Sequence, residues 1–188
     1  CYYYVGEKQF AGENTDPEAW RRLMAEEKSR GITYVVLAGA EPSLVPELCE
    51  VCYQKIPLGA IASNGIKRIP RSIDYRIHLS VWANDETRFK LRNARTMLLK
   101  QIDNYKGDPR AVFVYTFTRQ NIDEIHEVME LLAGQECRIT FNMFSAPIGY
   151  AGPLRHTEES LMHTRETMME LMSAYPENVL FSPYNAVA

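Results

Sequence analysis

The chain has 188 residues, of which 46% are hydrophobic and 24% charged, and its formal net charge is −3. This composition is typical of a globular domain with a hydrophobic core, and it excludes collagen-like and low-complexity classes. No apolar run approaches the roughly 20 residues that a membrane span needs, and the slightly acidic balance does not indicate a surface for nucleic acid or lipid. Four cysteines are too few for a disulfide scaffold, which favours a reducing, cytoplasmic compartment.

The first half of the chain alternates predicted helices and strands. Asp16 is a good N-cap and Pro17 suits the first helical position, so a helix is predicted from there to Arg30, with Gly31 closing it. The β-branched run over residues 33–37 predicts a strand that is buried on both faces. The next predicted elements are a helix over residues 44–54 and strands over residues 58–62 and 76–82.

The second half continues the alternation. Residues 85–105 predict a long amphipathic helix, which Gly107-Asp108-Pro109 ends. Residues 111–117 predict a strand, after which Asn121 is predicted to cap a helix. The last predicted elements are a strand over residues 138–144, a helix over residues 157–174 and a short strand over residues 179–182.

Strands that alternate with helices predict an α/β fold with a parallel sheet and right-handed crossovers, here in a single domain over residues 1–188. The pattern fits either a doubly wound sheet or a barrel. No G-x-G-x-x-G or G-x-x-x-x-G-K follows a strand, so the common nucleotide-binding fingerprints are absent from the sequence. In both architectures ligands bind at the carboxyl ends of the strands. These ends are predicted at residues 39–41, 63–65, 80–85, 116–121 and 142–150.

The cysteines and histidines do not have the spacing of a complete metal site. Cys49 and Cys52 form a C-x2-C pair, but they fall on the apolar stripe of a predicted helix, and the sequence has no second such pair to complete four ligands. We therefore expect both of them, and Cys137, to be buried packing residues. The four histidines show neither H-x3-H nor H-E-x2-H spacing, so no zinc site is predicted.

The order of residues at the strand ends resembles that of the radical S-adenosylmethionine (radical SAM) superfamily. Residues 37–42, Leu-Ala-Gly-Ala-Glu-Pro, are similar to its G-G-E-P motif with Ala40 in place of the second glycine, and Ser63-Asn64-Gly65 is similar to its T-N-G motif. Residues 77–80 resemble its I-S-L-D region, residues 112–125 its fifth strand and N-x-x-E-I helix start, and residues 142–149 its sixth strand and P-x-G loop. The resemblance covers most of residues 1–150. Residues 151–188 are expected to form a C-terminal extension of helix and strand.

The resemblance implies a partial (β/α)6 TIM-like barrel of parallel strands that is open on one side. The residues that it implies for SAM binding are Gly39, Ala40, Glu41, Asn64, Ser80 and Asn142. Glu41 would accept a hydrogen bond from the SAM ammonium group. Family members bind a [4Fe-4S] cluster through C-x3-C-x2-C, and Cys1 stands at the position of the third cysteine. The first strand and two cluster ligands would then be missing from this chain, which is expected to be inactive as it stands.

The implied function is reductive cleavage of SAM to a 5′-deoxyadenosyl radical, which acts on a small-molecule or peptide substrate of unknown identity. The electron would come from a donor such as flavodoxin or ferredoxin, and neither a nucleic acid nor a membrane is implied as a partner. Two alternatives stay open. One is a cluster-free TIM-barrel-like enzyme, for which Lys67 and Glu41 are the nearest catalytic candidates. The other is a non-catalytic barrel that serves as an interaction module.

Overall fold

The computed structural model describes residues 14–39, 41–81 and 98–181. Within them five parallel strands form one sheet in the order β1-β2-β3-β4-β5. The strands are β1 (Val35–Leu37), β2 (Gly59–Ser63), β3 (Arg76–Val81), β4 (Ala111–Phe117) and β5 (Ile139–Met143). Each strand pairs with the next one along the chain, whereas the strand order of a doubly wound sheet reverses at a switch point. The order therefore selects the partial TIM-like barrel from the two predicted architectures.

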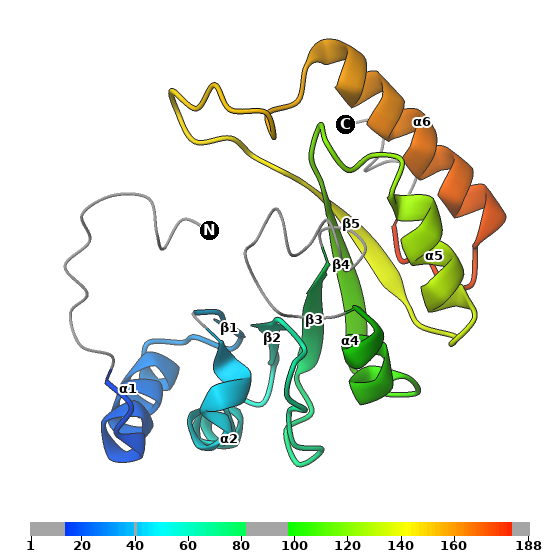
Figure 1. Cartoon of the computed structure of the whole chain (residues 1–188). Helices are drawn as coiled ribbons and strands as arrows, with labels where there is room; N and C mark the ends of the chain where they lie inside the picture. Colours follow the sequence, from blue (N-terminus) through cyan, green and yellow to red (C-terminus); the bar gives the residue numbers. More distant parts are fainter. Residues whose placement is uncertain (1–13, 40, 82–97, 182–188) are drawn as a thin grey trace.

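The helices lie on the outer side of the curved sheet (Figure 1). They are α1 (Pro17–Ser29), α2 (Pro46–Lys55), α4 (Leu98–Tyr105), α5 (Ile125–Ala133) and α6 (Glu158–Ala174), and the short 3-10 helix η2 (Pro42–Leu44) precedes α2. None of the helices in the described ranges combines the length and the apolar character needed to cross a membrane.

The two faces of the sheet differ in chemistry. The face toward the helices carries large apolar side chains that are almost completely buried, among them Ile61, Ile77, Leu79, Tyr115, Phe117 and Ile139. Ser80 pairs with Val114, and Val114 pairs with Thr140, so these three side chains share the opposite, concave face. By the same registers Ala62, His78, Thr116 and Asn142 also belong to the concave face. The core thus lies between sheet and helices, and the concave face is left with small and polar side chains.

Both ends of α1 confirm the predicted start and stop signals, and the start of α6 is capped as well. The Asp16 carboxylate accepts hydrogen bonds from the backbone N–H groups of Glu18 and Ala19, and Pro17 occupies the first turn of α1. Gly31 follows with a φ of +92°, a conformation that glycine adopts without strain. At α6, Thr157 caps the helix in a reciprocal pair of hydrogen bonds with Ser160.

Three local predictions were wrong. Tyr34 and Val36 are 54% and 61% exposed, because β1 lies at the edge of the sheet and the described part of the chain covers only one of its faces. Asn121 does not cap a helix: α5 begins at Ile125, and the Asn121 side chain closes the turn after β4 through Thr118 N–H and Thr116 O. Residues 179–181 make only a single parallel bridge, at Val179, rather than a strand. Of the helix predicted over residues 85–105, residues 85–97 lie outside the described ranges.

The connection between β2 and β3 is an irregular segment instead of a helix. A buried ion pair holds this segment at the end of the sheet where the strands begin. Arg110 donates to both carboxylate oxygens of Asp108 and to the backbone carbonyls of Ile69, Pro70 and Ile73. These bonds hold residues 66–75 as an irregular segment. The hydrogen bonds from Arg110 also lower the pKa of the Asp108 carboxyl group.

Candidate functional site

The carboxyl ends of the first three strands carry the polar residues that the sequence predicts for a ligand site. Glu41 follows β1, Asn64 follows β2, and Ser80 lies within the last two residues of β3. Because the strands are parallel and consecutive in the sheet, these ends lie along one edge. The side chains there are half-buried, so they are held by the protein and still reach solvent.

The Glu41 carboxylate joins the end of β1 to the end of β2. Its Oε1 accepts hydrogen bonds from Ser43 N–H at 3.0 Å and from the Ser63 hydroxyl at 2.7 Å. Its Oε2 accepts from Asn64 N–H at 2.7 Å. A carboxylate oxygen has two acceptor positions, so Oε2 retains capacity for one more donor. Glu41 is therefore fixed in orientation and can still accept from a bound cation.

Gln101 of α4 joins the end of β2 to the end of β3. This side chain is fully buried, and its Nε2 donates to the carbonyl oxygen of Asn64 at 2.6 Å and to that of Ser80 at 3.2 Å. Gly65 has a φ of +70°, and a Cβ there would lie 2.8 Å from Gln101 Cγ. The glycine thus provides both the turn and the space for the glutamine.

Gln101 was not predicted as part of the site, and Ser63 was included only in the strand end at residues 63–65, not among the residues implied for SAM binding. Gln101 is a polar residue on the buried stripe of α4, which also contains Leu98, Ile102 and Tyr105. A buried amide among apolar neighbours must find hydrogen-bond partners. A glutamine on the apolar stripe of a predicted helix was therefore the sequence signal that could have indicated Gln101. Ser63 stands within the Ser-Asn-Gly run and offered no separate signal.

The remaining predicted site residues are distributed differently. Gly39 is exposed at the end of β1, and Ala40 and Cys1 lie outside the described residues. Asn142 is exposed on the concave face of β5, where its Oδ1 accepts from Met143 N–H at 3.1 Å. Strand β4 separates Asn142 from Ser80. The structure thus brings Glu41, Asn64 and Ser80 together and places Asn142 on the same sheet face two strands away from Ser80.

His78 adds an uncharged base to the concave face, two residues before Ser80. Partial desolvation, with a smaller effect of the Arg76 cation, lowers the pKa of its imidazole below the usual 6.5. At neutral pH this side chain is therefore mostly in its neutral form.

The cysteines of the described ranges do not fit an iron–sulfur cluster. Cys49, Cys52 and Cys137 are unpaired and buried, as predicted for packing residues. Burial raises the pKa of Cys49 to about 12 and those of Cys52 and Cys137 to about 11, whereas a cluster ligand must be a thiolate. No three His, Cys, Asp or Glu side chains in the described part of the chain are grouped to hold a metal ion.

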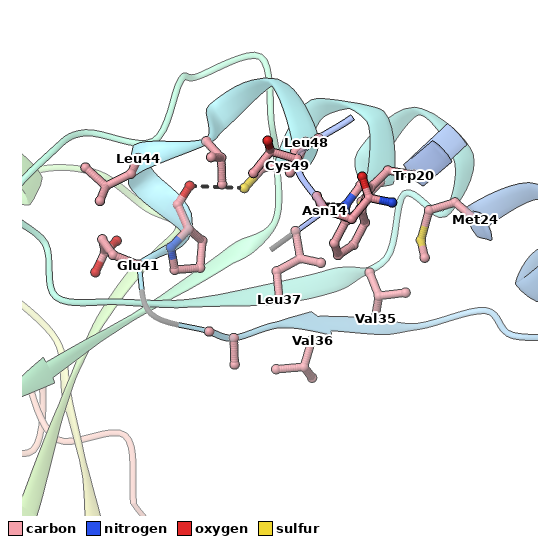
Figure 2. Close-up of a pocket in the computed structure, with 16 residues that line it drawn as sticks. Asn14, Trp20, Met24, Val35, Val36, Leu37, Glu41, Leu44, Leu48 and Cys49 are labelled. Carbon is pink, nitrogen blue, oxygen red and sulfur yellow. Dashed lines mark hydrogen bonds between the residues drawn. The ribbon is translucent and has the colours of Figure 1, made fainter. Parts of the chain in front are cut away.

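A cavity of about 530 Å³ lies beside β1, between that strand and the helices α1 and α2 (Figure 2). Its walls are mainly apolar, and Glu41 is the charged residue among the described residues that line it. The principal lining side chains are Trp20, Met24, Val35, Leu37, Leu48 and Cys49. The cavity therefore extends from Glu41, at the end of β1, into the apolar region between β1 and the helices.

No protein-family model matches the chain, and no curated protein sequence matches it. Solved structures do match it. Streptococcus suis SuiB bound to S-adenosylmethionine superposes with a TM-score of 0.70 at 18% identity, over 97% of this chain and 46% of SuiB. Native anSMEcpe with bound AdoMet (S-adenosylmethionine) gives 0.65 at 11% identity, over 93% of this chain and 56% of that protein. TYW1 with a lysine-pyruvate adduct bound gives 0.58 at 15% identity, over 89% and 66%.

The chain spans about half the length of SuiB and of anSMEcpe. At these identities the likeness establishes the fold alone, and it does so over almost the whole of this chain. The five consecutive parallel strands, with helices on one face and a polar edge at their carboxyl ends, agree with it. The chain therefore has the fold of a radical SAM core domain.

Proposed function

We propose that this chain is the SAM-binding core of a radical SAM enzyme. The observation that carries the proposal is the hydrogen-bonded edge formed by Glu41, Asn64 and Ser80 at the carboxyl ends of three adjacent strands. Two proteins of the same fold, SuiB and anSMEcpe, have been solved with SAM bound. The proposal joins these two facts.

The donors and acceptors of this edge fit the chemistry of SAM. The methionine part of SAM carries an ammonium and a carboxylate group, and its ribose carries two hydroxyl groups. Glu41 Oε2 can accept from the ammonium group in a charge-assisted hydrogen bond. The SAM carboxylate or ribose can form hydrogen bonds with the amide of Asn64 and the hydroxyl of Ser80. Further proposed contacts to SAM are Gly39, Ala40 and Asn142.

The buried cysteines Cys49, Cys52 and Cys137 do not fit an iron–sulfur cluster, so its ligands must be considered separately from the SAM site. When bound, a [4Fe-4S] cluster supplies the electron that cleaves SAM and produces the 5′-deoxyadenosyl radical. Cys1 remains the proposed ligand from this chain, and we propose that the 188 residues by themselves are inactive. The electron donor would be a protein such as flavodoxin or ferredoxin. The substrate would be a small molecule or a peptide.

The structure does not favour a cluster-free aldolase. Such an enzyme needs a lysine whose amine is desolvated at the strand ends. Lys67 lies instead in the irregular segment after β2, where its side chain is exposed. Glu41, the other candidate, accepts hydrogen bonds from three protein donors and retains one acceptor position, which this proposal assigns to the SAM ammonium group.

The proposal is tested with the full-length gene product that contains this chain. It is reconstituted anaerobically with iron and sulfide, reduced with dithionite and incubated with SAM, and 5′-deoxyadenosine is measured by mass spectrometry. Formation of 5′-deoxyadenosine that depends on both reductant and iron supports the proposal. A protein that holds iron but neither binds nor cleaves SAM overturns it.

A further inference from the structure

We infer that Gln101 is a positioning residue for the SAM site, which clamps the ends of β2 and β3 so that Asn64 and Ser80 keep the spacing that the ligand needs. The inference rests on the proposed function for its ligand. It rests on the structure alone for the clamp.

Gln101 acts where the pairing between the two strands stops. The last paired residues of β2 and β3 are Ser63 and Leu79. The carbonyl groups that Gln101 binds belong to the next residues, Asn64 and Ser80. An amide NH2 group has two hydrogens, and here each carbonyl takes one. The glutamine therefore continues the connection between the strands by one more step.

The Asn64 backbone is held on both sides. Its N–H donates to Glu41 Oε2, and its C=O accepts from Gln101 Nε2. Its side-chain Oδ1 accepts from Ile66 N–H at 3.0 Å, which fixes the orientation of the amide. Within the described ranges the Asn64 NH2 group has no hydrogen-bond acceptor, so it remains available to an acceptor atom of SAM.

The clamp belongs to the folded protein before any ligand arrives. Gln101 is fully buried, and Gly65 leaves the space that its side chain occupies. An apolar residue at position 101 would fill a similar volume but leave two carbonyl groups without this donor. The strand ends would then depend on water for their spacing, and part of the binding free energy would go into ordering them.

Two variants separate the clamp from general stability. Gln101→Leu removes both hydrogen bonds to the strand ends. Tyr105→Phe, one turn further along α4, also removes two buried hydrogen bonds, to Ile69 N–H and Lys67 O, which lie away from the strand ends. Because both variants lose two hydrogen bonds made by a buried side chain of the same helix, Tyr105→Phe is the matched control.

The first measurement is amide hydrogen exchange of the ligand-free protein. Gln101→Leu should accelerate exchange at Gly65 and Ile66 at least tenfold relative to Tyr105→Phe. The second is the affinity for SAM of the reconstituted full-length gene product, measured calorimetrically. We expect Gln101→Leu to weaken binding about tenfold and Tyr105→Phe to leave it within about twofold of the wild type.

A third variant tests the same clamp if Gln101→Leu does not fold. Gln101→Glu has the same shape, but its ionised carboxylate cannot donate to the two carbonyl groups. A protonated carboxyl group can donate once, so SAM affinity of this variant should improve as the pH falls, relative to wild type at the same pH. If the ratio of the SAM affinity of Gln101→Glu to that of wild type does not change with pH, the result contradicts the clamp.

The outcomes distinguish the two proposals. If wild type binds SAM and Gln101→Leu binds it equally well, the positioning role is overturned and the proposed function stands. If wild type does not bind SAM, the proposed function is overturned, and the exchange measurement alone decides whether the clamp exists. Equal exchange rates in Gln101→Leu and Tyr105→Phe overturn the clamp.

Discussion

Replacing Glu41 by Gln tests how the carboxyl ends of the strands contribute to the stability of the protein and to SAM binding. The change keeps the shape and removes the charge. The carboxylate accepts three hydrogen bonds, from Ser43 N–H, the Ser63 hydroxyl and Asn64 N–H. An amide accepts only through its oxygen. If that oxygen stays with Ser43 and Ser63, the NH2 group faces Asn64 N–H, so this bond is lost.

The expected magnitude follows from the bond that is lost. A hydrogen bond to a charged group contributes about 1.5–3 kcal/mol, so we expect Glu41→Gln to lower the free energy of unfolding by about that amount. In binding, loss of the charge opposite the SAM ammonium group should weaken affinity by about tenfold to a hundredfold. Urea unfolding measures the first quantity, and anaerobic titration calorimetry of the reconstituted full-length protein measures the second.

Glu50→Gln supplies the control, since it makes the same change of charge on the exposed face of α2. We expect it to alter the free energy of unfolding by less than about 0.5 kcal/mol and to leave SAM affinity unchanged. Unchanged affinity in Glu41→Gln would remove Glu41 from the SAM site. Unchanged stability would refute the argument that its carboxylate ties β1 to β2.

Three further predictions concern the buried ion pair between Asp108 and Arg110, the edge strand β1, and the cysteines of α2. Asp108→Asn leaves the Arg110 guanidinium buried without its counter-charge and should cost about 3–5 kcal/mol at neutral pH. Because Arg110 lowers the pKa of Asp108 in the folded state, this stabilisation is present above the ordinary carboxyl pKa and is lost as the pH falls through the lowered one. Urea unfolding of wild type and variant should therefore converge in acid, and a constant difference would contradict the prediction. Val36 lies on an exposed edge strand, so the isolated 188-residue chain should associate and Val36→Lys should reduce its light scattering; equal scattering would argue against association through β1. Replacing Cys49 and Cys52 together by Ala should cost about 1–3 kcal/mol in unfolding and leave the iron content of the reconstituted full-length protein unchanged, and loss of iron would mean that these thiols bind it.

Local sequence signals predicted the elements well where the cause is local. Asp16, Pro17 and Gly31 define α1 by capping chemistry that depends on a few neighbouring residues. The strand predicted over residues 111–117 agrees with β4, in which every residue except Thr116 is apolar. The strand-end rule also placed Glu41, Asn64 and Ser80 on one edge, since parallel strands direct their carboxyl ends to the same side.

The sequence did not reveal contacts between distant residues. Hydrophobic periodicity indicates which side of an element is buried, but it does not identify what covers the other side, and for this reason Val36 was expected to be buried. The partners of Gln101 lie 37 and 21 residues away along the chain, so no local pattern could name them. Glu41 was predicted for its charge, whereas its bonds to Ser63 and Asn64 became visible only in the structure.

The central claim is that SAM binds at the carboxyl ends of these strands, and amide hydrogen exchange with and without SAM tests it most directly. The reconstituted full-length protein is compared with the same protein under saturating SAM. We expect slower exchange at the ends of β1, β2 and β3, including the backbone N–H groups of residues 63–65, and no change at the opposite end of the sheet around Asp108. Protection confined to other segments, or no protection while SAM is bound, would contradict the claim.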